Sequence, residues 1–200
     1  ENIFGLDHSL WVKTEEILAS QSPTIEDIEK LSAQATANSY VKGRLDWQIV
    51  LSYALKDQAD KAALVLSRLM KNPQAPVSQD LMQITAARLL FQNGYFDSSI
   101  KYYEKVSKSS EYWTEAQEET AWAYIRKGEP NNAKAVTQSL VHPSMAYMVT
   151  PEGFFINSLA RLKVCDYAGV VASLGDFPKR FKERTKTLEK MSVDASTPDV

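Results

Sequence analysis

Two glycines, Gly94 and Gly128, lie 34 residues apart, and each occupies the same place in a recurring pattern. The first belongs to NGYFDSSIKYYEKVS and the second to KGEPNNAKAVTQSL. In both segments a helix-ending glycine precedes a new amphipathic helix. A fixed period of 34 residues is typical of two-helix units that stack on their neighbours. The spacing therefore predicts an all-α repeat array.

One position in the second helix of each predicted hairpin extends this period along the chain. The segments resemble the tetratricopeptide repeat family, whose second helix has a small residue where it crosses the first helix closely, and the candidates for that position are Ile28, Ala62, Ser99, Ala133 and Val170. Their spacings are 34, 37, 34 and 37 residues. The additional residues fall in two proline-containing loops, at 73–76 and 143–151. Stacked repeats tolerate insertions in such loops, so the period predicts five hairpins.

These positions resemble the tetratricopeptide repeat (TPR) family over about residues 43–176. Ala87 with Leu90 and Ala121 with Tyr124 match the small-then-large pair of the first helix, and Tyr103 matches the aromatic residue of the second helix. The early Trp of the family pattern is replaced by Asp46, Gln83, Gln117 and Phe154. The resemblance implies an all-α fold: a right-handed αα-superhelix (TPR-like solenoid) of about five helical hairpins and a C-terminal capping helix.

We expect a single array over residues 1–191. The hairpins are predicted at about 7–38, 42–72, 78–108, 111–141 and 151–176. Thr24 and either Ser78 or Asp80 are predicted to cap helices, and Pro151 fits a first helical turn. Pro178 is expected to begin a separate capping helix over 178–191, which is rich in Lys and Arg. Residues 192–200 are expected to form a disordered tail.

Composition excludes several classes of function. A net charge of −2 argues against nucleic-acid binding. The two histidines, His8 and His142, and the one cysteine, Cys165, form no metal-ligand or catalytic motif. No apolar run approaches the length of a membrane span, so we expect no direct membrane insertion. We therefore expect no enzyme activity and no cofactor.

The resemblance implies that one face of each first helix lines a concave groove. Carried over by register, this face includes Trp47, Arg88, Phe91, Glu118, Trp122, Arg126 and Phe155. Aromatic and Arg side chains are frequent anchors at protein interfaces, so the predicted ligand is a peptide or a protein segment. In a tight superhelix the same residues would instead pack together. Glu115, Glu118 and Glu119 form either a solvated acidic strip or part of a site for basic ligands.

Three functions remain open at this point. The first is a non-catalytic protein–protein interaction scaffold. The second is a structural segment of a larger multidomain cell-envelope protein, which the start at Glu1 favours. The third is a regulatory module that senses a ligand. The segments AWAYIRKGEPNNA and PEGFFINSLARLKVCDYAGVV resemble large bacterial cell-envelope repeat proteins, so we expect a periplasmic or envelope location rather than the cytoplasm. The sequence leaves the partner and the oligomeric state open.

Overall fold

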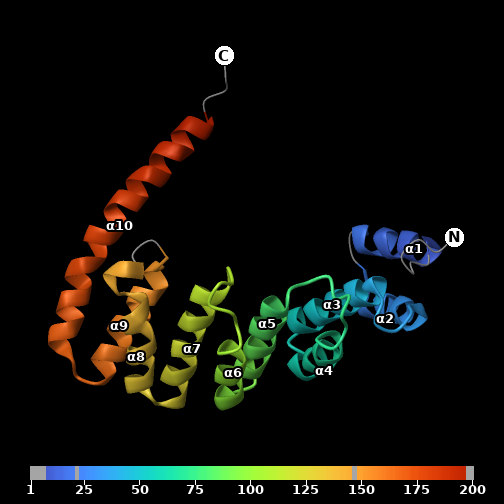
Figure 1. Cartoon of the computed structure of the whole chain (residues 1–200), viewed down its shortest axis with the longest axis horizontal. Coiled ribbons are helices and arrows are strands. Elements are labelled where there is room, and N and C mark those ends of the chain that lie inside the picture. Colours follow the sequence, from blue (N-terminus) through green and yellow to red (C-terminus); the bar gives the residue numbers. More distant parts are fainter. Residues whose placement is uncertain (1–7, 21–22, 146–147, 197–200) are drawn as a thin grey trace. The chain divides into compact units, whose positions relative to one another are not determined.

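The computed structural model describes residues 8–20, 23–145 and 148–196, and within them the chain is built of helices alone (Figure 1). The described residues form ten α-helices and one 3-10 turn: α1 (His8–Ala19), α2 (Ile25–Gln34), α3 (Tyr40–Leu55), α4 (Ala59–Leu69), α5 (Gln79–Gln92), α6 (Phe96–Tyr103), α7 (Trp113–Lys127), α8 (Pro130–Leu140), η1 (Pro143–Met145), α9 (Pro151–Lys163) and α10 (Tyr167–Ser196). The prediction of an all-α fold is confirmed.

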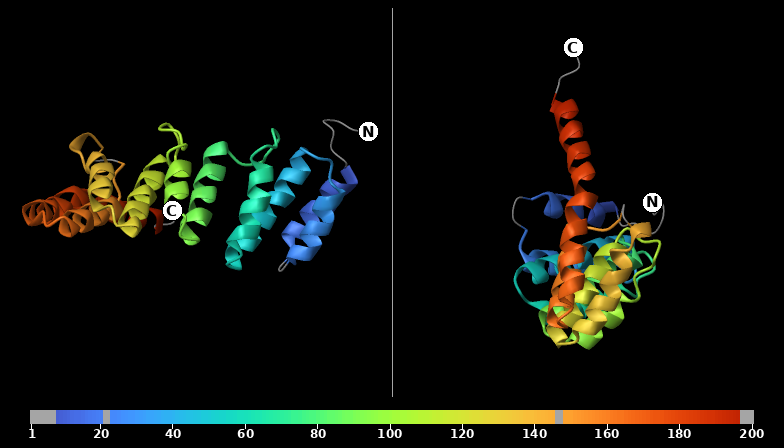
Figure 2. Two further views of the ribbon diagram at one scale, coloured as in Figure 1. Left: turned by 90° about the horizontal axis from the view of Figure 1, so that it is seen from below. Right: turned by 90° about the vertical axis from the view of Figure 1, so that its left-hand side faces the viewer.

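The helices fall into two compact units, residues 1–112 and residues 113–200, and the single array over residues 1–191 stays a prediction. The boundary lies in the connection between α6 and α7. Successive helices pair as hairpins: α1–α2, α3–α4 and α5–α6 in the first unit, and α7–α8 and α9–α10 in the second. Each hairpin also contacts the next one within its unit, and Figure 2 shows these helices side by side.

Five of the described helix starts are fixed by side-chain caps. The residues Thr24, Ser39, Ser78, Thr150 and Asp166 each accept a hydrogen bond from the backbone N–H three residues further on. Such a cap satisfies one of the amide groups that have no partner inside the helix. The predicted caps at Thr24 and Ser78 are confirmed, and Pro151 lies in the first turn of α9 as expected.

The turn inside each of the last four hairpins has one residue with a left-handed backbone conformation, at the same position of the repeat. Gly94 and Gly128 have φ angles of 79° and 84°, which glycine adopts without strain. Asp57 and Cys165 occupy the equivalent turns, with φ angles of 59° and 58°. The four positions are 37, 34 and 37 residues apart, so the repeat continues where glycine is absent. A non-glycine residue in this conformation costs about 1–2 kcal/mol.

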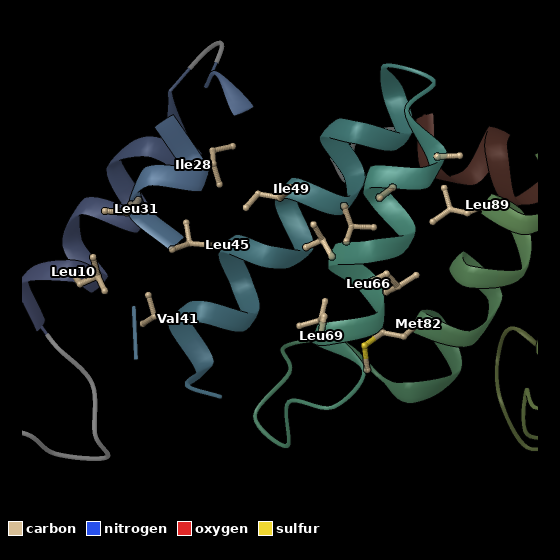
Figure 3. Close-up of a cluster of buried hydrophobic side chains, with 14 residues drawn as sticks. Leu10, Ile28, Leu31, Val41, Leu45, Ile49, Leu66, Leu69, Met82 and Leu89 are labelled. Atoms are coloured by element: carbon tan, nitrogen blue, oxygen red, sulfur yellow. The ribbon is translucent and has the colours of Figure 1, made fainter. Parts of the chain in front are cut away.

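Large aliphatic side chains fill the core of the first unit (Figure 3). Leu45 and Ile49 of α3 lie against α2, where Ile28 and Leu31 are buried, and Leu66 of α4 is buried in the same cluster. Met82 of α5 joins that cluster, so one continuous core runs through α1 to α5. Each hairpin therefore completes the core of the one before it, as expected for stacked repeats.

The predicted crossing points test the register of the repeats. Ile28, Ala62, Ser99 and Ala133 are all fully buried, which confirms the register over four hairpins. Val170 in the fifth hairpin is only half-buried. The last hairpin therefore departs from the pattern of the others.

The prediction of a separate capping helix at 178–191 is wrong. In the structure α10 continues through Pro178. One helix of 30 residues therefore replaces the predicted second helix of the last hairpin and the separate capping helix after it. Proline removes one backbone hydrogen bond and strains the preceding turn. Here Phe177 and Phe181 hold the helix across that position, because their rings lie 5.9 and 5.7 Å from the ring of Phe154. Tertiary packing thus overrides the local signal.

The same helix changes the prediction for the C-terminal segment. Residues 192–196, expected to be disordered, belong to α10, and residues 197–200 lie outside the described residues. The C-terminal part of α10 runs past the start of α9, where Arg184 donates a hydrogen bond to the carbonyl of Val149, and Figure 2 shows this extension. Since α10 continues as a straight extension, no separate capping helix folds back over the last hairpin within the described residues.

Candidate functional site

The predicted site residues of the second unit come together on α7 and α9. Trp122 of α7 lies beside Phe155 of α9, with ring centroids 6.0 Å apart. The Trp122 indole Nε1 donates a hydrogen bond of 2.8 Å to Oε1 of Glu152. Trp122 is half-buried, whereas Phe155 is 58% exposed. These three residues form a surface ridge with an aromatic centre and an acidic edge, called here the aromatic ridge.

Glu118 lies one turn before Trp122 on α7, but its carboxylate serves the protein itself. Its side chain is only 5% exposed, and its Oε1 accepts a hydrogen bond from the Thr150 hydroxyl. Thr150 in turn accepts from the Gly153 N–H at 3.1 Å and so caps α9. A Cβ at Gly153 would lie 2.9 Å from Glu118 Oε1, so glycine permits this close approach. Glu118 therefore positions the start of α9 instead of facing solvent.

Burial raises the pKa of the Glu118 carboxyl above its ordinary value. The Thr150 hydroxyl and the Gly153 N–H stabilise the charged form and lower the pKa, while the carboxylates of Glu152 and Glu115 raise it further. The positive end of the α9 dipole also favours a carboxylate at this place. Glu118 is thus a buried acid whose ionised form depends on the correct placement of α9.

Arg126 completes the predicted group on α7. It lies in the last helical turn and is exposed. Arg126 lies four positions after Trp122 in the sequence, so the two side chains share a helix face. A positive charge at this end is also favourable for the helix dipole. The surface around Trp122 therefore combines an aromatic ridge with acidic and basic groups at its two edges.

The site residues predicted in the first unit lie in two places. Arg88 and Phe91 are one turn apart on α5, where Arg88 is exposed and Phe91 packs edge-to-face on Phe96 at 5.4 Å. Arg88 corresponds to Trp122 one repeat earlier, 34 residues before it. Trp47 of α3 is half-buried and packs against the aliphatic core. Trp47 therefore contributes to the packing of its unit as well as to its surface.

Sequence reasoning missed three residues that shape this site: Thr150, Glu152 and Gly153. The segment Thr150-Pro151-Glu152 carries a helix-start signal, a capping hydroxyl before a first-turn proline and an acidic residue. That signal could have identified Thr150. The contacts of Thr150 with Glu118 and of Glu152 with Trp122 span about thirty residues, and no local pattern reports them.

Across residues 8–20, 23–145 and 148–196 no group of three His, Cys, Asp or Glu side chains is placed to hold a metal ion. In the same residues no helix is both long and apolar enough to cross a bilayer.

Comparisons with known proteins identify the fold. No protein-family model matches the chain, and no curated protein matches it. Two crystal structures of Podosopora anserina putative kinesin light chain nearly identical TPR-like repeats are similar in structure. The first, a form with one substitution, has a TM-score of 0.62 and 14% identity, and covers 81% of this chain and 87% of its own. The second has a TM-score of 0.65 and 14% identity, and covers 90% of this chain and 99% of its own.

These structures share the stacked helical hairpins described above. The similarity to bacterial cell-envelope repeat proteins stays a prediction. Together, the 34-residue register, the buried crossing residues and the structural matches assign the chain to the TPR-like helical-repeat fold.

Proposed function

We propose that this chain is a protein-interaction scaffold that binds a peptide or protein segment on the faces of its first helices. TPR-like repeats commonly act in this way, because stacked hairpins offer a long surface with little rearrangement. The observation that carries the proposal is the aromatic ridge. An exposed Phe155 beside a half-buried Trp122 offers apolar area on rigid helices.

The ridge has the properties of an interface anchor. Aromatic side chains dominate binding energy at interfaces, above all where they are held in place before binding. Here the hydrogen bond to Glu152 fixes the indole, and Glu118 fixes the helix that supplies Phe155. The Glu152 carboxylate at one edge favours a ligand with a basic residue next to an apolar anchor. We therefore propose a peptide of that composition.

The decisive experiment removes the aromatic side chain of Trp122 while the helical fold is kept intact. A displayed library of short peptides is selected on the purified chain, and the affinity of the selected peptides is measured by isothermal titration calorimetry. Trp122→Ala is expected to weaken binding by about 2 kcal/mol or more, the usual size for an interface hot spot. Tyr95→Ala removes another exposed aromatic side chain, outside the ridge, and is expected to leave the affinity unchanged.

Circular dichroism of the same variants separates the possible results. Retained helical content with lost binding supports the ridge as the site. If Trp122→Ala unfolds the chain, Trp122 is a core residue and the proposed site is wrong. If neither stability nor binding changes, the selected peptides bind another face of the array.

A further inference from the structure

The buried carboxylate of Glu118 lies next to the aromatic ridge. Glu118 precedes Trp122 by one turn of α7, so the two side chains are on the same face of that helix. The carboxylate accepts a hydrogen bond from the Thr150 hydroxyl, and a Cβ at Gly153 would lie 2.9 Å from its Oε1. Glu118 is therefore in contact with the first turn of α9, the helix that supplies the other two residues of the ridge.

The charged groups that act on this carboxylate are acidic. Burial raises the pKa of Glu118 most, and the negative charges of Glu152 on α9 and Glu115 on α7 raise it further. Glu152 is also the acceptor of the 2.8 Å hydrogen bond from the Trp122 indole. The acid that holds the tryptophan of the ridge is thus the same acid that favours the protonated form of Glu118.

The basic groups of the neighbouring helices make other contacts. Arg184 of α10 donates a hydrogen bond of 2.7 Å to a backbone carbonyl before α9, and Arg180 lies over the Phe154 ring at 5.4 Å. Lys134 of α8 lies 3.9 Å from Asp166, beyond the opposite end of α9. The exposed Glu152 edge of the ridge therefore keeps its acidic character.

A basic residue of a ligand at this edge would change the balance at Glu118. Glu118 is only 5% exposed, so a ligand that covers the ridge removes little further water from it. A positive charge next to Glu152 attracts the ionised form of Glu118, and this attraction is weakly screened because the carboxylate is buried. The charge of the ligand therefore favours loss of the Glu118 proton.

We propose that the aromatic ridge is a proton-linked binding site, at which a peptide with a basic residue at the Glu152 edge binds most tightly when Glu118 is ionised. Binding then releases the Glu118 proton to solvent, and by linkage the affinity rises with pH as that proton is lost. This inference rests on the proposed function of the ridge. It adds a regulatory input, the pH of the surroundings, to that function.

The direction of the pKa shift sets the range in which the change is expected. Because the pKa of Glu118 is raised, the affinity should change at a higher pH than the range in which exposed glutamates titrate. His142, in the connection between α8 and α9, is exposed and bonded to Ser144. Histidine also exchanges protons between about pH 5 and 8, so its contribution must be measured separately.

The test counts the protons that binding exchanges. A peptide selected on the purified chain, with a lysine next to its apolar anchor, is titrated by calorimetry in two buffers of different ionisation enthalpy. Net proton release is expected, with an affinity at least about threefold higher at about pH 7.5 than at about pH 5. The matched ligand has norleucine in place of the lysine, which keeps the apolar stem without the charge, and should release no proton.

Variants assign the proton to Glu118. Glu118→Gln keeps an acceptor for Thr150 but cannot ionise, so it should release no proton and should bind at both pH values with the low-pH affinity of the original chain. His142→Gln should leave the proton release unchanged. If Glu118→Gln loses helical content, carbon-13 NMR of the Glu118 carboxyl in the original chain replaces it. The midpoint of that titration should move to lower pH when the peptide is bound.

The possible failures separate this inference from the function on which it rests. Binding that depends on Trp122 but releases no proton, or releases it equally in Glu118→Gln, would overturn the proton link and leave the ridge as a binding site. Net proton uptake would also overturn it, because desolvation by the ligand would then outweigh attraction. If no selected peptide binds through Trp122, the proposed function fails and the proton link fails with it.

Discussion

The first unit and the hairpin stack of the second unit reach the same architecture by different packing. In the first unit, Leu45, Ile49 and Leu66 fill the space between helices with large side chains. Around α7, α8 and α9 the buried cluster is Ala121, Ala133, Ile156 and Ala160. Alanines let helix backbones approach closely, whereas leucines hold them apart and bury more apolar area per residue. One repeat geometry therefore tolerates either solution.

This difference predicts opposite sensitivities to mutation. A core of large side chains is damaged most by truncation, because a cavity remains. A close contact of alanines is damaged most by enlargement, because neighbouring helices must move apart. Three substitutions test this contrast and the polar contact that accompanies the alanine stack.

The largest expected effect is in the first unit. Leu66→Ala removes a side chain that is 1% exposed and should lower the free energy of unfolding by about 2–5 kcal/mol. Urea denaturation followed by circular dichroism measures this change. The matched control is Leu64→Ala on the exposed side of the same helix, expected within about 0.5 kcal/mol of the original chain. Equal losses for the two variants would contradict the assignment of Leu66 to the core.

The second effect tests the alanine stack. Ala133 is fully buried where α8 crosses its neighbours, so Ala133→Leu should cost about 1–3 kcal/mol through overpacking. The control is Ala135→Leu, two residues further on the exposed side of α8. An unchanged melting temperature for Ala133→Leu would mean that the stack has room for a larger side chain, and the contrast between the units would fail.

The smallest effect concerns Glu118, and it depends on pH. Burial raises the pKa of this carboxyl in the folded state, so the folded chain holds its proton at a higher pH than the unfolded chain does. The stability from this group is therefore present at low pH and is lost as pH rises through the raised pKa. Glu118→Gln keeps an acceptor for Thr150 without the buried charge. At neutral pH it should change stability by no more than about 1 kcal/mol, toward greater stability.

The pH profile is the sharper measurement for this variant. Thermal melts from acidic to neutral pH should show the advantage of Glu118→Gln shrinking as the pH falls, because the original carboxyl then becomes neutral. Glu111→Gln, an exposed glutamate before α7, serves as the control. A clear loss of stability at neutral pH would show that the charged form is needed to cap α9.

Much of the fold was predictable because its signals are local or periodic. The crossing residues Ile28, Ala62, Ser99 and Ala133 follow from the repeat spacing together with the family resemblance, and all are buried. The continuity of α10 was not predictable, because the packing of Phe177 and Phe181 on Phe154 outweighs a local proline signal. The left-handed turns at Asp57 and Cys165 were missed because neither residue is glycine.

The candidate site was predictable only in part. Register placed Trp122 and Phe155 on one face of neighbouring repeats, and the structure brings their rings together. The same register placed Glu118 on the predicted ligand-binding surface, whereas its carboxylate accepts a hydrogen bond from the Thr150 hydroxyl. Periodicity reports which way a side chain points, but it carries no information about a hydrogen bond to a distant loop.

The bond between Glu118 and Thr150 also has a consequence for the order in which the helices form. The hydroxyl that caps α9 is oriented by a carboxylate on α7, so α9 has its complete start only once α7 is in place. A growing chain leaves the ribosome with α7 first, so the carboxylate that completes the start of α9 is synthesised before α9 itself.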